Sequence, residues 1–191
     1  MEKEELTLER LEKIIAEKNV IALRELFENE QTIDIAEKAD RLDDIKQLLF
    51  IFKTVKSEYT AELFGYLSPE NKEKLVNVFT DKDLMELIAN SYTDDIVDFL
   101  TEMPANLVTR ILKVSDKDTR ADINHLLNYK ERTAGAIMTT EYVTLLSTST
   151  VEEALASIRK IGREAETIYT NFVIDAKRNL VGTIDLDDLI F

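Results

Sequence analysis

The chain has 191 residues, of which 45% are hydrophobic and 32% are charged, and this is the composition of a folded protein of one or two domains. Its 38 acidic and 24 basic side chains give a net charge of -14, which attracts cations and repels nucleic-acid phosphates and anionic lipid headgroups. Cysteine is absent, which excludes disulfide bonds, thiolate metal sites and cysteine nucleophiles. The charged start and the lack of any run of about 18–20 apolar residues predict a soluble chain without a signal peptide.

Residues 6–128 carry the pattern of consecutive short helices. Apolar residues recur there at helical spacing, and cap signals interrupt them at short intervals. Ser68 followed by Pro69 predicts an N-cap and the first residue of a helix. Thr32 and Ser115 are interpreted as the N-caps of two further helices. The chain has only four glycines and two prolines, so we expect short connections between the helices.

A weak internal repeat lies within this helical region. The segment Glu62–Phe64 matches the segment Asp98–Leu100, at an offset of 98 − 62 = 36 residues. A period of this length is typical of paired antiparallel helices that stack on their neighbours and bury a continuous core. The repeat therefore predicts a helical superhelix.

The pattern changes to alternating strands and helices after the helical region. Tyr142–Leu145 is predicted to be a short strand, and a helix is expected to begin after Thr150 and to end at Gly162. Two further strands are predicted over residues 169–174 and 180–184, joined by a hairpin-like turn. A last helix is expected to follow directly. The order is strand, helix, strand, strand, helix.

The most specific stretch of the sequence is YKERTAGAIMTTEYVTL, at residues 129–145. It resembles the entry to the first CBS domain of the MgtE family of bacterial magnesium channels, in which a helical cytosolic domain precedes a pair of CBS motifs. Two further segments agree in order and spacing, SYTDDIVDFLTEMP at residues 91–104 and AETIYTNFVIDAKRNLVGTIDLDDLI at residues 165–190. The resemblance covers nearly the whole chain.

The resemblance implies a mostly α chain, a helical superhelix followed by a partial α/β CBS motif. Its expected parts are an MgtE-like N-terminal helical domain over residues 1–128, a linker over 129–136, and a first CBS motif over 137–191 that is incomplete at its last helix. Because CBS motifs work in pairs, a second CBS motif and a transmembrane domain are the expected partners in the full-length protein, together with a second copy in a homodimer. The chain would then lie on the cytoplasmic side of the cell membrane.

Two aspartates at helical spacing are the main candidates for metal ligands. Asp94 and Asp98 are four residues apart and share one helix face, while Glu62 stands at the repeat-equivalent position of Asp98. Such a pair of like charges costs a few tenths of a kcal/mol without a cation, and the sequence has no lysine or arginine over residues 90–109. Mg²⁺ prefers oxygen ligands and typically takes one or two carboxylates. Acids in a first helical turn are also favoured by the macrodipole, which explains Asp94 and Asp95 without a metal.

The resemblance implies that Mg²⁺ ions bridge the helical domain and the CBS module. On that basis Asp94 and Asp98 are the principal ligands, Glu62 is a further ligand, and the backbone carbonyl of Gly135 faces the same site. The function implied is Mg²⁺ sensing. Abundant Mg²⁺ would favour a compact state that closes the pore, and scarce Mg²⁺ would let carboxylate repulsion separate the domains.

Two other functions stay open on the sequence alone. One is a metal-independent helical and CBS module that docks a protein partner. The other is a nucleotide sensor, for which Asp188 fits the usual CBS motif, but Asp185 stands where a serine or threonine would contact ribose and phosphate and would repel phosphate. An enzyme is not expected, because the single histidine, His125, has no partner motif and no nucleophile or P-loop pattern occurs.

Overall fold

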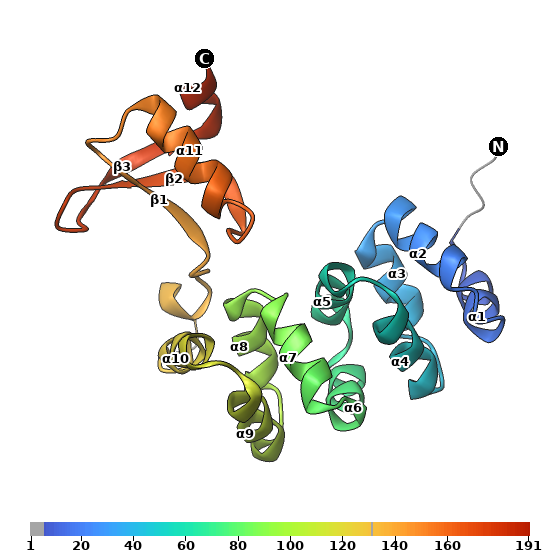
Figure 1. Cartoon of the computed structure of the whole chain (residues 1–191). Coiled ribbons are helices and arrows are strands. Elements are labelled where there is room, and N and C mark those ends of the chain that lie inside the picture. The colour runs from blue at the N-terminus through green and yellow to red at the C-terminus, as the bar shows by residue number, and fades with distance from the viewer. Residues whose placement is uncertain (1–5, 131) are drawn as a thin grey trace. The chain divides into compact units, whose positions relative to one another are not determined.

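The computed structural model describes residues 6–130 and 132–191. Two compact units are present (Figure 1): one comprises the chain up to Ser91 and Asp95–Asn128, and the other comprises Tyr92–Asp94 and Tyr129–Phe191. None of the helices in these described ranges is both long and apolar enough to cross a lipid bilayer.

The first unit is a succession of short helices that follow one another along a curved array (Figure 1). They are α1 (Leu8–Ala16), α2 (Val20–Asn29), α3 (Thr32–Ala39), α4 (Ile45–Thr54), α5 (Ser57–Tyr66), α6 (Pro69–Val78), α7 (Asp81–Ala89), α8 (Thr93–Thr101), α9 (Ala105–Val114) and α10 (Lys117–Leu126). Second neighbours pack on one another, as α3 does on α5, α5 on α7 and α7 on α9, while α2 packs on α4 and α4 on α6. This arrangement is the predicted helical superhelix.

The repeat that builds the superhelix is shorter than the sequence match indicated. The helices α5 to α10 begin at Ser57, Pro69, Asp81, Thr93, Ala105 and Lys117, so each begins 12 residues after the one before it. A period of 36 residues therefore contains three helices, where the sequence predicted one pair. The match at 36 residues relates α5 to α8, which are three helices apart.

The helix caps agree with the sequence at some positions and differ at others. The Ser68 hydroxyl accepts from the backbone N–H of Asn71, so Ser68 caps α6 as predicted. The predicted cap at Thr32 is wrong, because α3 already includes Thr32 and Gln31 occupies the cap position without a side-chain bond. The Thr32 hydroxyl instead donates to Glu62 Oε2 at 2.7 Å. A contact with another helix has displaced the local capping bond.

The predicted cap of α10 at Ser115 is displaced by one residue. Asp116 caps this helix, since its Oδ1 accepts from the backbone N–H groups of Asp118 and Thr119. The buried Ser115 hydroxyl donates backwards to the carbonyl of Ile111 in α9. Aspartate is at least as good a cap as serine, and here it is the one that faces the open helix end.

A chain of phenylalanines joins four helical segments in the core of the first unit. The ring centroids of Phe64 and Phe99 are 4.9 Å apart, and those of Phe52 lie 6.3 Å from Phe64 and 5.4 Å from Phe79. Such pairs contribute about 0.5–1.5 kcal/mol beyond the burial of their area. Phe99 thereby holds α8 against α5, and this contact fixes which face of α8 is turned to solvent.

The second unit has the predicted order of strands and helices. It contains the short 3-10 turn η1 (Ala134–Ala136), β1 (Tyr142–Leu146), α11 (Val151–Ile161), β2 (Thr167–Ile174), β3 (Leu180–Asp185) and α12 (Leu186–Ile190). The strands lie in the order β1-β2-β3, with β1 and β2 parallel and β2 and β3 antiparallel. The parallel pair follows from the helical crossover of α11, and the antiparallel pair from the short turn. The core beneath the helices consists of Val143, Leu145, Ala154, Ile158 and Leu189.

Gly162 ends α11, as the sequence predicted. A Cβ at this position would lie 2.5 Å from the carbonyl oxygen of Ile158 and 2.6 Å from Cγ2 of Ile168. The helix end and the first residues of β2 can approach this closely only because the position is glycine.

Candidate metal site on helix α8

Helix α8 turns Asp95 and Asp98 to its exposed side, whereas Asp94 lies at the edge of the buried side, with its Oδ1 buried. The buried apolar residues of the helix are Ile96, Val97, Phe99 and Leu100, each 7% exposed or less. Asp95 and Asp98 are exposed and Asp94 is half-buried. Asp94 and Asp98 are one turn apart, so both predicted ligands lie on the same side of the helix. Two carboxylates in this arrangement offer oxygen ligands to a hydrated divalent cation.

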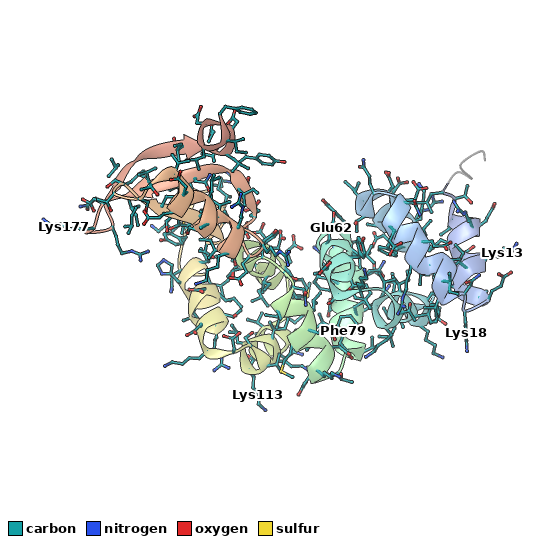
Figure 2. The ribbon with its side chains drawn as sticks, turned by 45° about the horizontal axis from the view of Figure 1, so that its top comes forward. Lys13, Lys18, Glu62, Phe79, Lys113 and Lys177 are labelled. Atoms are coloured by element: carbon teal, nitrogen blue, oxygen red, sulfur yellow. The ribbon has the colours of Figure 1, made fainter. Side chains whose placement is uncertain are left out.

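Glu62 is exposed on α5 and already has a partner. Its Oε2 accepts the hydrogen bond from the hydroxyl of Thr32, and Thr32 itself is 6% exposed on α3. Figure 2 shows Glu62 on the ribbon of α5. The bond satisfies a buried hydroxyl and fixes the direction of the carboxylate. Glu62 therefore has a structural role that the sequence did not reveal, beside the ligand role predicted for it.

Gly135 lies in the turn η1 and is half-buried. A Cβ at this position would lie 2.2 Å from Cδ1 of the Tyr129 ring and 2.5 Å from its Cγ and Cε1. Glycine is therefore required here for a close approach within the second unit. The role predicted for its carbonyl oxygen stays a prediction.

Glu141 is a charged residue that the sequence analysis did not single out. Its Oε1 accepts from the backbone N–H of Thr93 at 3.1 Å and from the Thr93 hydroxyl at 2.6 Å. Its Oε2 accepts from the Thr139 hydroxyl at 3.2 Å, from the Thr140 hydroxyl at 3.0 Å and from the Thr140 N–H at 3.2 Å. Thr93 and Glu141 both belong to the second unit, and Thr93 is the first residue of α8.

Glu141 is held in its charged form. Burial alone would raise its pKa, but the hydrogen bonds from Thr93, Thr140 and Thr139 hold the pKa of this carboxyl below its ordinary value. A carboxylate at the beginning of a helix is favoured by the macrodipole. A local sequence pattern could not have shown this contact, because 48 residues separate Thr93 from Glu141.

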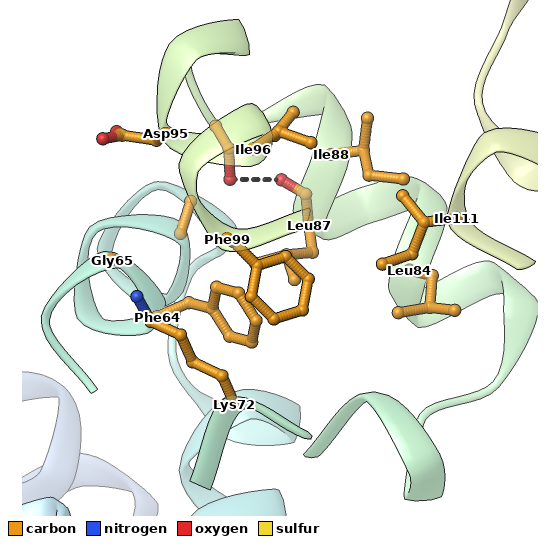
Figure 3. A pocket seen from close by; sticks show the side chains of 12 residues that line it. Phe64, Gly65, Lys72, Leu84, Leu87, Ile88, Asp95, Ile96, Phe99 and Ile111 are labelled. Carbon is orange, nitrogen blue, oxygen red and sulfur yellow. Dashed lines mark hydrogen bonds between the residues drawn. The ribbon is translucent and has the colours of Figure 1, made fainter. Parts of the chain in front are cut away.

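A small cavity lies beside α8 in the first unit (Figure 3). Its volume is about 30 Å³, and its lining is Ala61, Phe64, Gly65, Lys72, Leu84, Leu87, Ile88, Ser91, Asp95, Ile96, Phe99 and Ile111. This volume holds about two water molecules and is too small for an organic ligand. Lys72 and Asp95 are the charged residues of the lining, and they come from α6 and α8.

Lys72 supplies a cation that the sequence around α8 lacks. Burial lowers the pKa of its ammonium group, while the carboxylates of Glu102, Asp95, Asp98 and Asp40 oppose that change by favouring the charged form. Its Nζ lies 5.9 Å from the centroid of the Phe64 ring, within the range of a cation–π contact. The sequence has no lysine or arginine over residues 90–109, but the fold brings one in from α6.

A second acidic group lies where β3 meets α12. Asp185, Asp187 and Asp188 are all exposed, and one carboxylate oxygen from each lies within 4.8 Å of those of the other two. The Thr170 hydroxyl donates to Asp185 Oδ1 at 2.6 Å. Asp185 and Asp188 belong to the modified nucleotide motif of the sequence. The structure adds Asp187 and concentrates three negative charges there, which opposes the approach of a phosphate without a cation.

Comparison with known proteins matches both parts of the chain. Residues 30–132 match the MgtE intracellular N domain, and residues 134–191 match the CBS domain. The magnesium transporter MgtE of Thermus thermophilus is 33% identical over 184 residues, an alignment that covers 94% of the chain and 40% of that protein. The chain thus spans about two fifths of the length of this curated relative.

Two solved structures have the same fold. The soluble part of a magnesium transporter superposes with a TM-score of 0.87 at 28% identity, covering 96% of the chain and 72% of that structure. The cytosolic domain of the Mg²⁺ channel MgtE in complex with ATP superposes with a TM-score of 0.85 at 31% identity, covering 96% of the chain and 75% of that structure.

Proposed function

Because the chain belongs to the MgtE family, we propose that it is the Mg²⁺-sensing regulatory region of an MgtE-like magnesium channel. The observation that carries the proposal is the placement of Asp94 and Asp98 one turn apart on α8, where Asp94 is half-buried and Asp98 is exposed. The acidity of the whole chain, with a net charge of -14, supports it, because such a chain gains more from binding a divalent cation than a neutral one.

In this proposal Mg²⁺ acts by favouring one of two conformations. A hydrated Mg²⁺ ion is held by Asp94 and Asp98, with Glu62 and the carbonyl of Gly135 as further ligands, and it bridges the helical domain and the CBS domain. Only the compact conformation supplies ligands from both domains, so Mg²⁺ shifts the population towards it and the pore closes. When Mg²⁺ is scarce, repulsion between carboxylates favours the separated conformation.

The existing contact of Glu62 restricts how it could bind a metal. One of its oxygens, Oε2, receives the hydrogen bond of Thr32. The ligand oxygen is then Oε1, and the Thr32 bond orients it. Thr32→Val would leave the carboxylate in place but remove this orientation, so it is expected to weaken Mg²⁺ binding less than Glu62→Gln does.

The partners proposed for the full-length protein are a second CBS motif, a transmembrane domain and a second copy of the chain, on the cytoplasmic side of the membrane. Apolar side chains on the strands support a partner for the CBS motif: Tyr169 is 76% exposed, Leu180 65% and Val181 61%. Tyr169 lies at one end of the paired strands β2 and β3, and Leu180 and Val181 lie at the other, so exposed apolar side chains extend along the strands, as they do on a surface that a partner covers. Sedimentation of residues 129–191 is expected to show a dimer or a larger species, and a stable monomer contradicts this part of the proposal.

A direct test of the function is calorimetric titration of the 191-residue chain with MgCl₂, beside the same chain extended through the second CBS motif. Both are expected to bind Mg²⁺, and the extended chain more tightly because it supplies more ligands. The matched variant carries Asp94→Asn and Asp98→Asn and should lose the binding heat. Binding heat that is unchanged in this variant, or absent from both parent chains, contradicts the proposal and favours a metal-independent interaction module.

Nucleotide binding is the second candidate, because one of the structurally similar proteins was solved with ATP. In this chain the three acids at the start of α12 require a cation to accompany the phosphates. Titration with ATP in EDTA and in excess MgCl₂ separates the possibilities. We expect no binding heat in EDTA, and tight binding there would show that Asp185 does not exclude phosphate.

A further inference from the structure

Lys72 lies near the acidic side of α8, and the proposed function does not use it. It lies in the first turns of α6, is half-buried, and reaches along the Phe64 ring to the cavity that Asp95 also lines (Figure 3). Burying part of an ammonium group is unfavourable unless nearby charge or an aromatic face offsets it. Both are present at this position.

Most of the carboxylates that favour the charged form of Lys72 belong to α8 or to Glu102, the residue directly after α8. Glu102, Asp95 and Asp98 contribute in that order, and Asp40 contributes less. Asp98 is also one of the two principal ligands in the proposed Mg²⁺ site. A single positive charge from α6 therefore acts on the same carboxylates that a divalent cation would neutralise.

Neighbouring basic residues have other partners. Lys74, two residues further along α6, pairs with Glu70 at 2.6 Å and is half exposed. Arg110 pairs with Asp81 at 2.9 Å and also donates to the carbonyls of Val76 and Phe79. These cations stabilise α6, α7 and their connection, whereas Lys72 lies over Phe64 and lines the same cavity as Asp95 of α8.

We propose that Lys72 is a built-in competitor of Mg²⁺, whose ammonium group neutralises the acidic side of α8 in the metal-free protein and so raises the Mg²⁺ concentration at which the site fills. The inference rests on the proposed function and adds the residue that sets its threshold. The ammonium group lies over the Phe64 ring, a favourable position that it can keep when a metal ion binds, and its effect on the carboxylates of α8 acts through space.

The competition has two consequences. Lys72 reduces the mutual repulsion of the carboxylates when Mg²⁺ is scarce, so the metal-free helix is less strained than the sequence around α8 indicates. It also repels an incoming divalent cation. Removing the charge should therefore lower the Mg²⁺ concentration at half saturation by about three- to tenfold at moderate ionic strength, since a charge and a divalent ion a few ångströms apart interact appreciably even when screened.

The test is an Mg²⁺ titration of the 191-residue chain at constant ionic strength, followed by the NMR shifts of the backbone amides of α8. Lys72→Met removes the charge and keeps an apolar stem, and Lys72→Gln serves as a second neutral variant if the methionine variant does not fold. Lys72→Arg keeps the charge. Lys74→Met is the matched control, because it removes a positive charge from the same helix, α6, but this charge pairs with Glu70. The neutral variants at position 72 should saturate at lower Mg²⁺, and the other two should match the parent within about twofold.

The outcomes separate this inference from the function on which it rests. If the parent responds and both neutral variants saturate at the same concentration as the parent, Lys72 is not a competitor and the Mg²⁺ site stands. If Lys74→Met lowers the midpoint as much as Lys72→Met does, the effect is one of net charge and the inference fails. If neither the parent nor any variant responds, the Mg²⁺ site fails and the competition fails with it. A response that appears only in the neutral variants supports the inference in its strongest form.

Discussion

Replacing both predicted ligands, by Asp94→Asn with Asp98→Asn, is the most informative perturbation of α8. The change keeps the size and shape of the two side chains and removes their charge. Asparagine carbonyls replace ionised oxygens only weakly as ligands of a hard cation such as Mg²⁺. The variant is therefore expected to lose most of the Mg²⁺-induced stabilisation of the parent.

The magnitude can be worked out from binding linkage. An ion that binds only the folded state stabilises it by about 1.4 kcal/mol at ten times its dissociation constant. For a chain of 191 residues, each 1 kcal/mol raises Tm by about 2–4 °C, so the parent should gain about 3–6 °C. The double variant should gain less than about 1 °C under the same conditions.

The metal-free proteins should differ little. Loss of the two charges relieves about 0.2–0.5 kcal/mol of repulsion between residues four apart. It also removes about 0.3–1 kcal/mol of interaction between Asp94 and the helix macrodipole, and Asp98 no longer attracts Lys72. These contributions have opposite signs, so we expect a small fall in the metal-free Tm, of about 3 °C or less.

The chain contains a matched control for this variant on another helix. Asp118 and Asp122 stand at the second and sixth positions of α10, as Asp94 and Asp98 do in α8, and both are exposed. Thermal melts of the parent, the α8 double variant and the Asp118→Asn, Asp122→Asn double variant are compared in EDTA and in excess MgCl₂, with NaCl to match ionic strength. Equal Mg²⁺ shifts in all three proteins, or equal losses in the two variants, would refute a specific role for Asp94 and Asp98.

Three further predictions concern the scaffold around the site. Glu141→Gln should lower the free energy of unfolding by about 1–2 kcal/mol at neutral pH, because hydrogen bonds to a charged carboxylate are lost. The pKa of Glu141 is lowered in the folded state, so its contribution to stability is present above the ordinary pKa of 4.5 and is lost as the pH falls below that value. The free energies of unfolding in urea of the parent and the variant should therefore converge in acid. Gly135→Ala should lower the free energy of unfolding by about 1–3 kcal/mol, because the added Cβ would contact the Tyr129 ring. Gly182→Ala is the control: there is open space around Gly182, so the free energy of unfolding should change by less than about 0.5 kcal/mol. Equal effects of the two variants in chemical denaturation would contradict this. Residues 1–128 alone should melt cooperatively, and a non-cooperative calorimetric transition would show that the boundary is misplaced.

The local pattern of the sequence predicted which helices and strands form, but it did not predict where all of them begin and end. Ser68 and Pro69 predicted the start of α6, and the glycine at position 162 predicted the end of α11, because both signals act within a single turn. Thr32 failed as a cap because a carboxylate on another helix accepts its hydroxyl. The 12-residue spacing of the helices was not predicted, because the sequence match related helices that are three positions apart.

The candidate site shows the same division between local and tertiary information. The spacing of Asp94 and Asp98 and the apolar residues between them predicted their common side of α8. Lys72 and Glu141 could not be predicted in this way, because each reaches α8 from a distant part of the sequence. A charge that is absent from a segment of sequence can still be present in the structure beside it, and a count of charges along the chain does not reveal this.

Mg²⁺ is proposed to bring the helical domain and the CBS domain together, and the distance between a label in each unit is a direct measure of this change. The chain contains no cysteine, so Lys113→Cys and Lys177→Cys, at exposed positions in the first and second units (Figure 2), allow two dyes to be attached without a background reaction. The energy-transfer efficiency between the dyes is expected to change on addition of MgCl₂ until it saturates, and the distribution of distances should narrow to one. The variant with Asp94→Asn and Asp98→Asn should not show this change. An energy transfer that is the same with and without Mg²⁺, or that changes equally in the double variant, would contradict the proposal.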